Sequence, residues 1–227
     1  MSDMVHRGAG SSNDNAKFRV SRLLGVSYVD PAQRVIRELI GRDLSNTEMA
    51  AVVGAPEGSL LRVEARGNRI FTSTVHPKID RQYRFIERDD KGRLYLYNDE
   101  FFKKDPAKDA KLGLTSFITQ VLAARSLGAK YIEAFLDGSW QTRNKVNGYY
   151  VWALYGYDVA LYDHEIASLP SRFKGVRTLN ELILAEGDDW WYRKGTGREA
   201  VFDLSDGSTS LMVLALRAAY KGYNVVF

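Results

Sequence analysis

"KLGLTSFITQVLAARSLGAKYIEAFL", residues 111–136, decides the fold, because its pattern of apolar residues changes once along its length. The first half repeats apolar side chains at the spacing of one helix face: Leu114, Phe117, Ile118, Val121 and Leu122. Gly128 ends this helical pattern, and residues 129–136 alternate as a strand does. Since a strand is also expected before the helix, the segment predicts a right-handed crossover with at least one parallel strand pair.

The segment before this crossover, residues 58–104, has the period of two that is typical of strands. Four runs rich in β-branched and aromatic residues are separated by turn signals at Gly67-Asn68, at Pro77 and at residues 89–92. Such close spacing predicts an antiparallel meander. Together with the crossover, it predicts an α+β or α/β fold in which helices flank a mixed, mostly antiparallel sheet.

The N-terminal part is expected to contribute a tail, one strand and two helices. Residues 1–16 are small and polar, which predicts a flexible tail. Residues 17–28 resemble a strand. A helix should follow at residues 30–41 with Asp30 as its cap, and a second at residues 45–54.

The C-terminal part continues the alternation of elements. Residues 144–156 predict a helix-like element rich in aromatic rings, and residues 178–195 predict one amphipathic helix. A strand, a tight turn and a final helix are expected after residue 198. We therefore expect residues 17–227 to form one domain, with 165–227 a helix-strand-helix extension that completes the sheet or covers one of its faces.

Composition excludes several classes of protein. The 227 residues are 45% hydrophobic, which suffices for a sizeable core, and no apolar run approaches the ~20 residues needed to cross a bilayer. We expect a soluble, cytoplasmic protein without a membrane segment. Cysteine is absent from the sequence and the three histidines lie far apart, so no metal site is expected. The net charge of +4 comes from interleaved acidic and basic residues, so we do not expect nucleic-acid binding.

The start of the helix in the quoted stretch has the features of a phosphate-binding site. Residues 113–116 would place several unpaired backbone N–H groups at the positive end of the helix dipole. Lys111 adds positive charge, and Gly113 lets the backbone approach a phosphate closely. In the alternative interpretation, Thr115 or Ser116 caps the helix and the turn binds no phosphate.

The order of elements over residues 58–160 resembles the GNAT superfamily of acyl-CoA N-acyltransferases. Within it, "NKVNGYYVWALYGYD" at residues 144–158 resembles a family motif in which an asparagine precedes an aromatic helix that closes on glycine and an aromatic residue. The resemblance implies that acetyl-CoA or another acyl-CoA is the cofactor and that an amine is the acceptor. It assigns cofactor binding to Lys111, Gly113, Leu114, Thr115, Ser116, Asn147 and Trp152.

Some residues depart from the family pattern. The phosphate loop of the family has a basic residue and a second glycine where this chain has Ala110 and Thr115. The tyrosine that family members use as the general acid would fall at Trp152. Tyr150, or else Tyr149 or Tyr155, would therefore have to donate the proton to the departing thiolate.

Three carboxylates are candidates for the base that amine acylation requires. Asp99 and Glu100 end the strand before the phosphate-binding turn, and Glu133 lies among aromatic residues on the next strand, which would raise its pKa. Glu133 has an alternative role as the ion-pair partner of a basic residue on a neighbouring strand. Two functions are therefore expected: an acyl-CoA-dependent N-acyltransferase, or a non-catalytic GNAT-like scaffold that binds a protein partner or serves as a structural component of a larger assembly.

Overall fold

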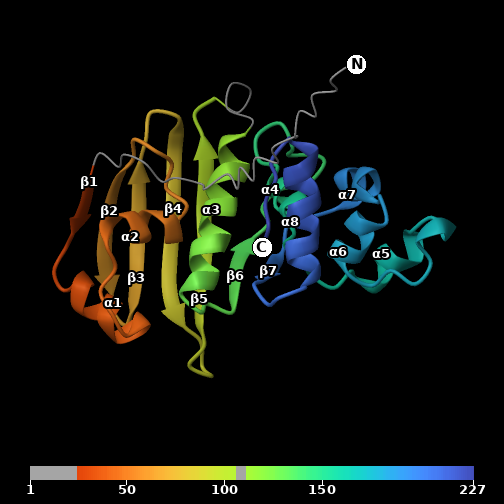
Figure 1. Cartoon of the computed structure of the whole chain (residues 1–227). Coiled ribbons are helices and arrows are strands. Elements are labelled where there is room, and N and C mark those ends of the chain that lie inside the picture. The colour runs from red at the N-terminus through yellow and green to blue at the C-terminus, as the bar shows by residue number, and fades with distance from the viewer. Residues whose placement is uncertain (1–24, 106–110) are drawn as a thin grey trace, which may run out of the picture.

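A computed structural model describes residues 25–105 and 111–227. The tail expected at residues 1–16 and the first part of the strand expected at residues 17–28 lie outside these ranges. The described residues form a seven-stranded mixed sheet with helices packed against it (Figure 1).

The strands lie side by side in the order in which they occur along the chain. Two pairs are parallel, β1 with β2 and β5 with β6, and the other pairs are antiparallel. The expected meander and the parallel pair across the crossover are thereby confirmed. The strands are β1 (Gly25–Tyr28), β2 (Leu60–Arg66), β3 (Arg69–Val75), β4 (Ile79–Arg88), β5 (Leu94–Lys103), β6 (Tyr131–Phe135) and β7 (Glu199–Asp203).

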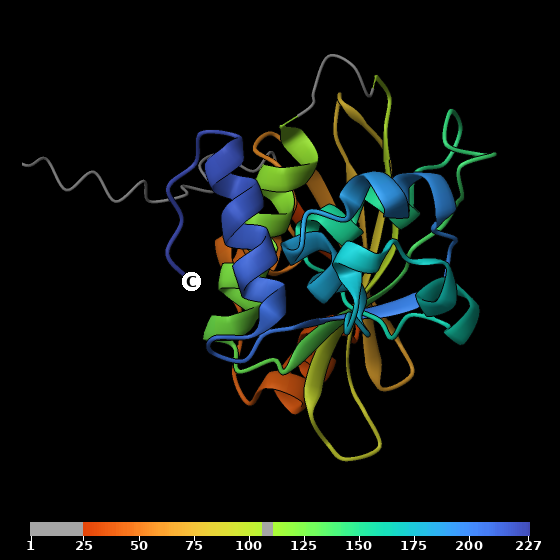
Figure 2. The ribbon, with the colours of Figure 1, turned by 90° about the vertical axis from the view of Figure 1, so that its right-hand side faces the viewer.

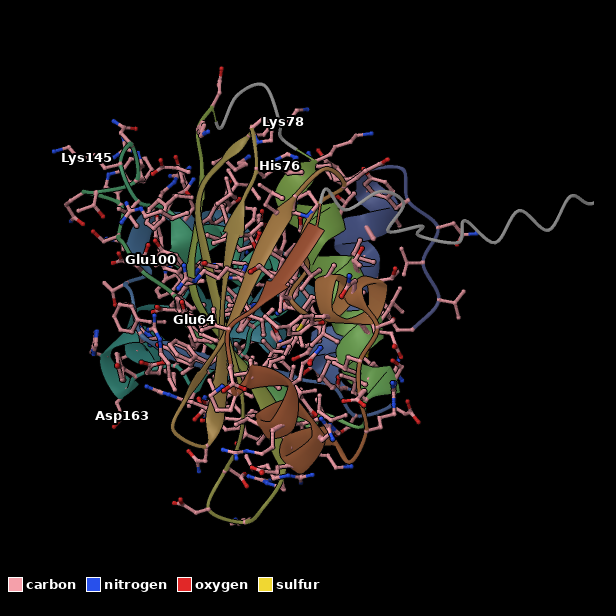
Figure 3. The ribbon with its side chains drawn as sticks, turned by 90° about the vertical axis from the view of Figure 1, so that its left-hand side faces the viewer. Glu64, His76, Lys78, Glu100, Lys145 and Asp163 are labelled. Carbon is pink, nitrogen blue, oxygen red and sulfur yellow. The ribbon has the colours of Figure 1, made fainter. Side chains whose placement is uncertain are left out.

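Four helices cover one face of the sheet, and the opposite face of β2–β5 is not covered by a helix (Figures 1 and 3). They are α1 (Ala32–Ile40), α2 (Asn46–Val52), α3 (Leu112–Ser126) and α8 (Thr209–Tyr220). The core lies between the helices and the sheet, where Ile70, Ile86, Leu96 and Ile132 are fully buried. Alternation along each strand places the other residues on the open face.

The starts of the two N-terminal helices differ in how they are capped. Ser45 accepts a hydrogen bond from the Glu48 backbone, and the Glu48 carboxylate accepts one from the Ser45 backbone, so α2 begins with a capping box. The expected cap of α1 is wrong. Pro31 occupies the capping position of α1 without a side-chain hydrogen bond, which leaves Asp30 one residue too early to cap the helix.

The aromatic stretch at residues 144–156 forms less helix than its pattern predicts. Only α4 (Gly148–Val151) and the 3-10 turn η1 (Ala153–Tyr155) are helical. Gly156 then reverses the chain with a positive φ of 95°, and a Cβ there would lie 2.3 Å from the Ser210 carbonyl oxygen of α8. The close approach of α8 ends the helix here.

The C-terminal residues complete the sheet, because β7 pairs with β6 along its whole length. The helices α5 (Asp163–Ser168), α6 (Leu179–Leu184) and α7 (Asp188–Lys194) lie beyond the β7 edge (Figures 1 and 2), together with the 3-10 turn η2 (Ser171–Phe173). The single helix expected at residues 178–195 is wrong: α6 and α7 are separate. Between them Gly187 packs so tightly on Leu182 that a Cβ would lie 2.8 Å from the Leu182 carbonyl oxygen.

A candidate phosphate-binding turn beside buried polar groups

The N-terminal turn of α3 lacks a side-chain cap from any described residue. Lys111 occupies the capping position without a side-chain hydrogen bond. The Thr115 hydroxyl instead donates back into the helix, to the carbonyl oxygens of Lys111 at 3.1 Å and Leu112 at 3.0 Å. Ser116 Oγ is buried and has no hydrogen-bond partner among the described residues. The expectation that Thr115 or Ser116 caps the helix is therefore wrong.

The absence of such a cap leaves backbone donors at the start of α3. The first backbone bond of the helix runs from the Thr115 N–H to the Lys111 carbonyl oxygen at 3.0 Å. The N–H groups of Leu112, Gly113 and Leu114 precede it and therefore have no acceptor inside the helix. They lie at the positive end of a helix of 15 residues. This arrangement is suited to an anion.

The predicted residues of this turn occupy different environments. Gly113 is buried, and a Cβ there would lie 3.3 Å from the Tyr155 hydroxyl and 3.5 Å from the Phe101 ring. Leu114 points into the core and is 2% exposed. Lys111 is exposed, and its Nζ lies 5.3 Å from the centre of the Tyr223 ring, which follows α8. The assignment of Lys111 and Gly113 to phosphate binding stays a prediction.

Beside this turn, a buried arginine of β4 lacks an anionic partner. Arg84 is 3% exposed, and none of the described carboxylates forms an ion pair with it. Its Nη1 donates to the carbonyl oxygens of Tyr83 at 2.8 Å and Glu100 at 2.7 Å, while its Nε has no hydrogen-bond partner. Burial lowers the pKa of Arg84 to about 10, so the guanidinium remains a cation at neutral pH.

Arg84, Gly113, Ser116 and Trp152 line one small enclosed space. Aromatic rings fill much of it. Trp152 packs edge-on against Phe101, with ring centres 6.4 Å apart, and against Phe117, with ring centres 5.5 Å apart. The space is too small for a water molecule, so a bound group would have to displace one of the rings. The Trp152 ring is partly exposed.

The same region is where β5 and β6 separate. Their pairing ends at Asn98 and Ala134, although β5 continues to Lys103. Here β5 also contains a bulge: Tyr83 pairs with Glu100 and Arg84 with Asn98, so Asp99 is an extra residue. Bulges of this kind redirect side chains and are frequent beside active sites.

Glu100 and Glu133 both belong to the open face, which Figure 3 shows for Glu100. Arg81 Nη1 lies 3.3 Å from the Glu100 carboxylate. Glu133 forms no ion pair with any described lysine or arginine, so its expected role as an ion-pair partner is not observed. Burial raises the pKa of Glu133, as the sequence predicts, and the nearby carboxylates of Glu199, Glu87 and Asp89 raise it further.

Two predicted residues lie away from the enclosed space. Tyr150 packs on Tyr192 with ring centres 4.7 Å apart, and burial followed by the charge of Asp188 raises its pKa to about 12. Asn147 is exposed before α4, where its backbone bridges to Gly138. The tyrosine that lies beside Gly113 is Tyr155.

Sequence reasoning missed Arg84 and Phe101. A signal for Arg84 was present, because strand alternation gives Gln82, Arg84 and Ile86 the same inward orientation. A charged residue at such a position needs an explanation. Phe101 carried no comparable signal, since an aromatic residue is ordinary in a strand.

Metal binding, membrane insertion and similarity to known proteins are the other possible indications of function. Within residues 25–105 and 111–227, His, Asp and Glu side chains form no cluster of three or more that could hold a metal ion. No helix in these ranges is long and apolar enough to span a membrane. Comparison with protein-family models, curated proteins and solved structures gave no match to this chain. The interpretation of the site therefore depends on its residues alone.

Proposed function

We propose that this protein is an acyl-CoA-dependent N-acyltransferase that binds the diphosphate of its acyl donor at the N-terminal turn of α3. The observation that carries the proposal concerns residues 25–105 and 111–227: no side chain in these ranges caps the first N–H groups of α3, and two buried polar side chains beside them, Ser116 and Arg84, are incompletely paired there. Leaving such groups unsatisfied costs about 1–3 kcal/mol each. A ligand that supplied acceptors would recover part of this cost.

Each residue of the site has a distinct role in this proposal. The N–H groups of Gly113 and Leu114 donate to the diphosphate, and Lys111 contributes charge. Arg84 and Ser116, which line the same small space as Gly113, are further donors to the diphosphate oxygens.

Proton transfer is assigned to two further side chains. Glu100, on the open face, accepts a proton from the ammonium of the acceptor. Burial raises the pKa of Tyr155 to about 12, so its hydroxyl remains protonated at neutral pH and available as a proton donor. Tyr155, which packs against Trp152 and Phe117, takes this role in place of Tyr150, which packs on Tyr192.

A second candidate function is a non-catalytic scaffold. Its support comes from the rings of Phe101, Trp152 and Tyr155, which fill the region that an acyl chain would need. In this alternative the aromatic cluster is core, and the molecule acts by binding a protein partner in a larger assembly.

Calorimetric titration with CoA, acetyl-CoA and pantetheine distinguishes the two functions. The acyltransferase proposal expects CoA and acetyl-CoA to bind and pantetheine, which lacks the diphosphate, to bind far more weakly. Gly113→Pro removes one N–H donor in the first helical turn, where proline is tolerated, and should weaken CoA binding about tenfold or more. Gly113→Ala also adds a Cβ but keeps the N–H, so it is the control that measures the effect of the Cβ, and it should weaken CoA binding less than Gly113→Pro does.

Two results would contradict the proposal. Failure of the wild type to bind CoA at millimolar concentration would exclude the acyl-donor site and favour the scaffold. Equal loss of affinity in Gly113→Pro and Gly113→Ala would show that the N–H group is not a donor. If CoA binds, release of free thiol from acetyl-CoA with a panel of amines tests catalysis itself.

A further inference from the structure

The open face of the sheet contains a hollow of about 500 Å³ across β2 to β5. Its lining includes Arg62 and Arg66 of β2, Tyr83 of β4, and Asp99 and Glu100 of β5. Figure 3 shows Glu64 and Glu100 on this face, on the side of the sheet away from α3. The volume is within the range of small-ligand sites.

Charge is distributed unequally between the two ends of this hollow. At the β2 end, Arg62 and Arg66 share a single carboxylate, that of Glu64, so one positive charge remains. At the β5 end, Glu100 pairs with Arg81, while Asp99 is exposed and forms no ion pair with a described residue. The hollow therefore has a positive end and a negative end.

The positions of the charged side chains are supported by the strands below them. The Arg66 guanidinium lies over the Phe71 ring, 3.4 Å from its centre, which holds it flat against the sheet. Tyr83 packs beside Phe71, with ring centres 5.6 Å apart, and is partly exposed between the two charged ends. An apolar or aromatic group would fit over Tyr83.

The length of a matching ligand follows from strand geometry. The strands β2 and β5 are three positions apart in the sheet. Their backbones are therefore separated by about 14 Å, and the side chains that lean inward shorten the distance between charges. An extended peptide spans about 3.3–3.6 Å per residue, so three residues cover about 10 Å.

We propose that this hollow binds a free peptide of about three residues, with its C-terminal carboxylate at Arg62 and Arg66 and its N-terminal ammonium at Asp99 and Glu100. A central aromatic side chain would stack on Tyr83. Binding of the peptide does not require acyl-CoA. Only its further role as the acceptor, with its α-amine next to Glu100, rests on the proposed function.

The test uses the full chain and titration calorimetry with the tripeptide Gly-Phe-Gly in the absence of CoA. The free peptide should bind, and its N-acetylated and C-amidated forms should each bind about tenfold more weakly or worse, because each lacks one charged group. Asp99→Asn should weaken binding of the free peptide about tenfold, while affinity for the N-acetylated form stays unchanged. Asp90→Asn, an equally exposed change in the β4–β5 turn, is the matched control and should have no effect.

The outcomes separate this inference from the proposed function. Absence of peptide binding, or equal affinity for the free and the blocked peptides, would overturn the inference even if CoA binds to the wild type. Peptide binding without CoA binding would support the hollow as a peptide site and remove the acyltransfer role. A circular-dichroism spectrum like that of the wild type would confirm that Asp99→Asn is folded.

Discussion

The interpretation of the α3 turn depends on the directions of two hydroxyl groups, which cannot be predicted from the sequence alone. The hydroxyls of Thr115 and Ser116 both stood at positions from which a helix can be capped. In the structure the first donates back into α3 and the second has no partner. The roles of Gly113 and Lys111 stay predictions. The direction of a hydroxyl depends on its neighbours in space, which is why this part of the site could not be predicted.

The unpaired hydroxyl of Ser116 predicts a variant that gains stability and loses ligand binding. In Ser116→Ala the buried hydroxyl disappears, and we expect the free energy of unfolding to rise, by up to about 1 kcal/mol. Affinity for acetyl-CoA should fall at least several-fold, because a donor to the diphosphate is lost. Urea unfolding and calorimetry measure the two effects.

Ser210→Ala is the matched control for this change. Ser210 is also buried, but its hydroxyl accepts hydrogen bonds from the Asp203 backbone at 3.1 Å and from Asn180 at 3.3 Å. We expect its removal to lower the free energy of unfolding by about 1–3 kcal/mol and to leave acetyl-CoA binding unchanged. Lower stability in Ser116→Ala, with unchanged binding, would contradict the role assigned to Ser116.

At the scale of elements, local signals predicted most of the fold. The strands of the meander, α2 and α3 follow from alternation, turns and helical spacing that the chain shows locally. The helix expected at residues 144–156 was wrong in extent because its aromatic residues pack on distant elements. Tyr149 donates a hydrogen bond to the Tyr192 carbonyl oxygen at 2.7 Å, and Trp191 donates one to the Tyr149 carbonyl oxygen at 2.8 Å. Such contacts leave no periodic trace in the sequence.

The capping box of α2 predicts a stability effect that depends on pH. Hydrogen bonds from Arg42 and from the Ser45 backbone and hydroxyl lower the pKa of Glu48 from 4.5 to about 2. The folded state therefore favours the ionised carboxylate, whose contribution is present above pH 4.5 and is lost as the pH falls toward 2. Urea unfolding should show Glu48→Gln less stable than the wild type at pH 7, with a smaller difference at pH 3.

Two further variants check that this effect comes from the cap. Ser45→Ala should cost about 1 kcal/mol at pH 7. Glu38→Gln changes a carboxylate of α1 that lies 3.7 Å from Arg34 in an exposed ion pair, and it should change stability far less. A difference for Glu48→Gln that does not change between pH 7 and pH 3 would mean that the carboxylate's charge is not responsible.

For the whole molecule, a buried ion pair links α5 to the start of β7 within the C-terminal part of the chain. Arg198, just before β7, donates to the Glu165 carboxylate of α5 at 2.9 Å and 2.5 Å, and the two side chains are only 5% and 4% exposed. The Arg198 guanidinium also lies 4.0 Å from the centre of the Tyr162 ring. Nothing local in the sequence predicted this pair, since its members are far apart along the chain.

Removal of one member should destabilise the molecule strongly. Arg198→Met leaves a buried carboxylate unpaired, and we expect a loss of about 3–5 kcal/mol in denaturant unfolding. Adding Glu165→Gln removes that charge and should restore much of the loss. Arg193→Met breaks only the exposed contact with Asp189 at 4.0 Å and should change stability by less than about 0.5 kcal/mol. A double variant no more stable than Arg198→Met would show that the unpaired charge is not the cause.

The strands lie in the sheet in the order in which they are translated, and this order affects how the sheet can form during synthesis on the ribosome. Every strand after β1 is hydrogen-bonded to the strand translated immediately before it. A nascent chain can therefore extend the sheet one strand at a time. The longest interval between successive strands separates β6 from β7, while α4 to α7 are being translated. During that interval the edge of β6 has no partner, and unpaired strand edges are the surfaces on which chains mispair. Once β7 has been translated, it pairs with β6 and covers this edge.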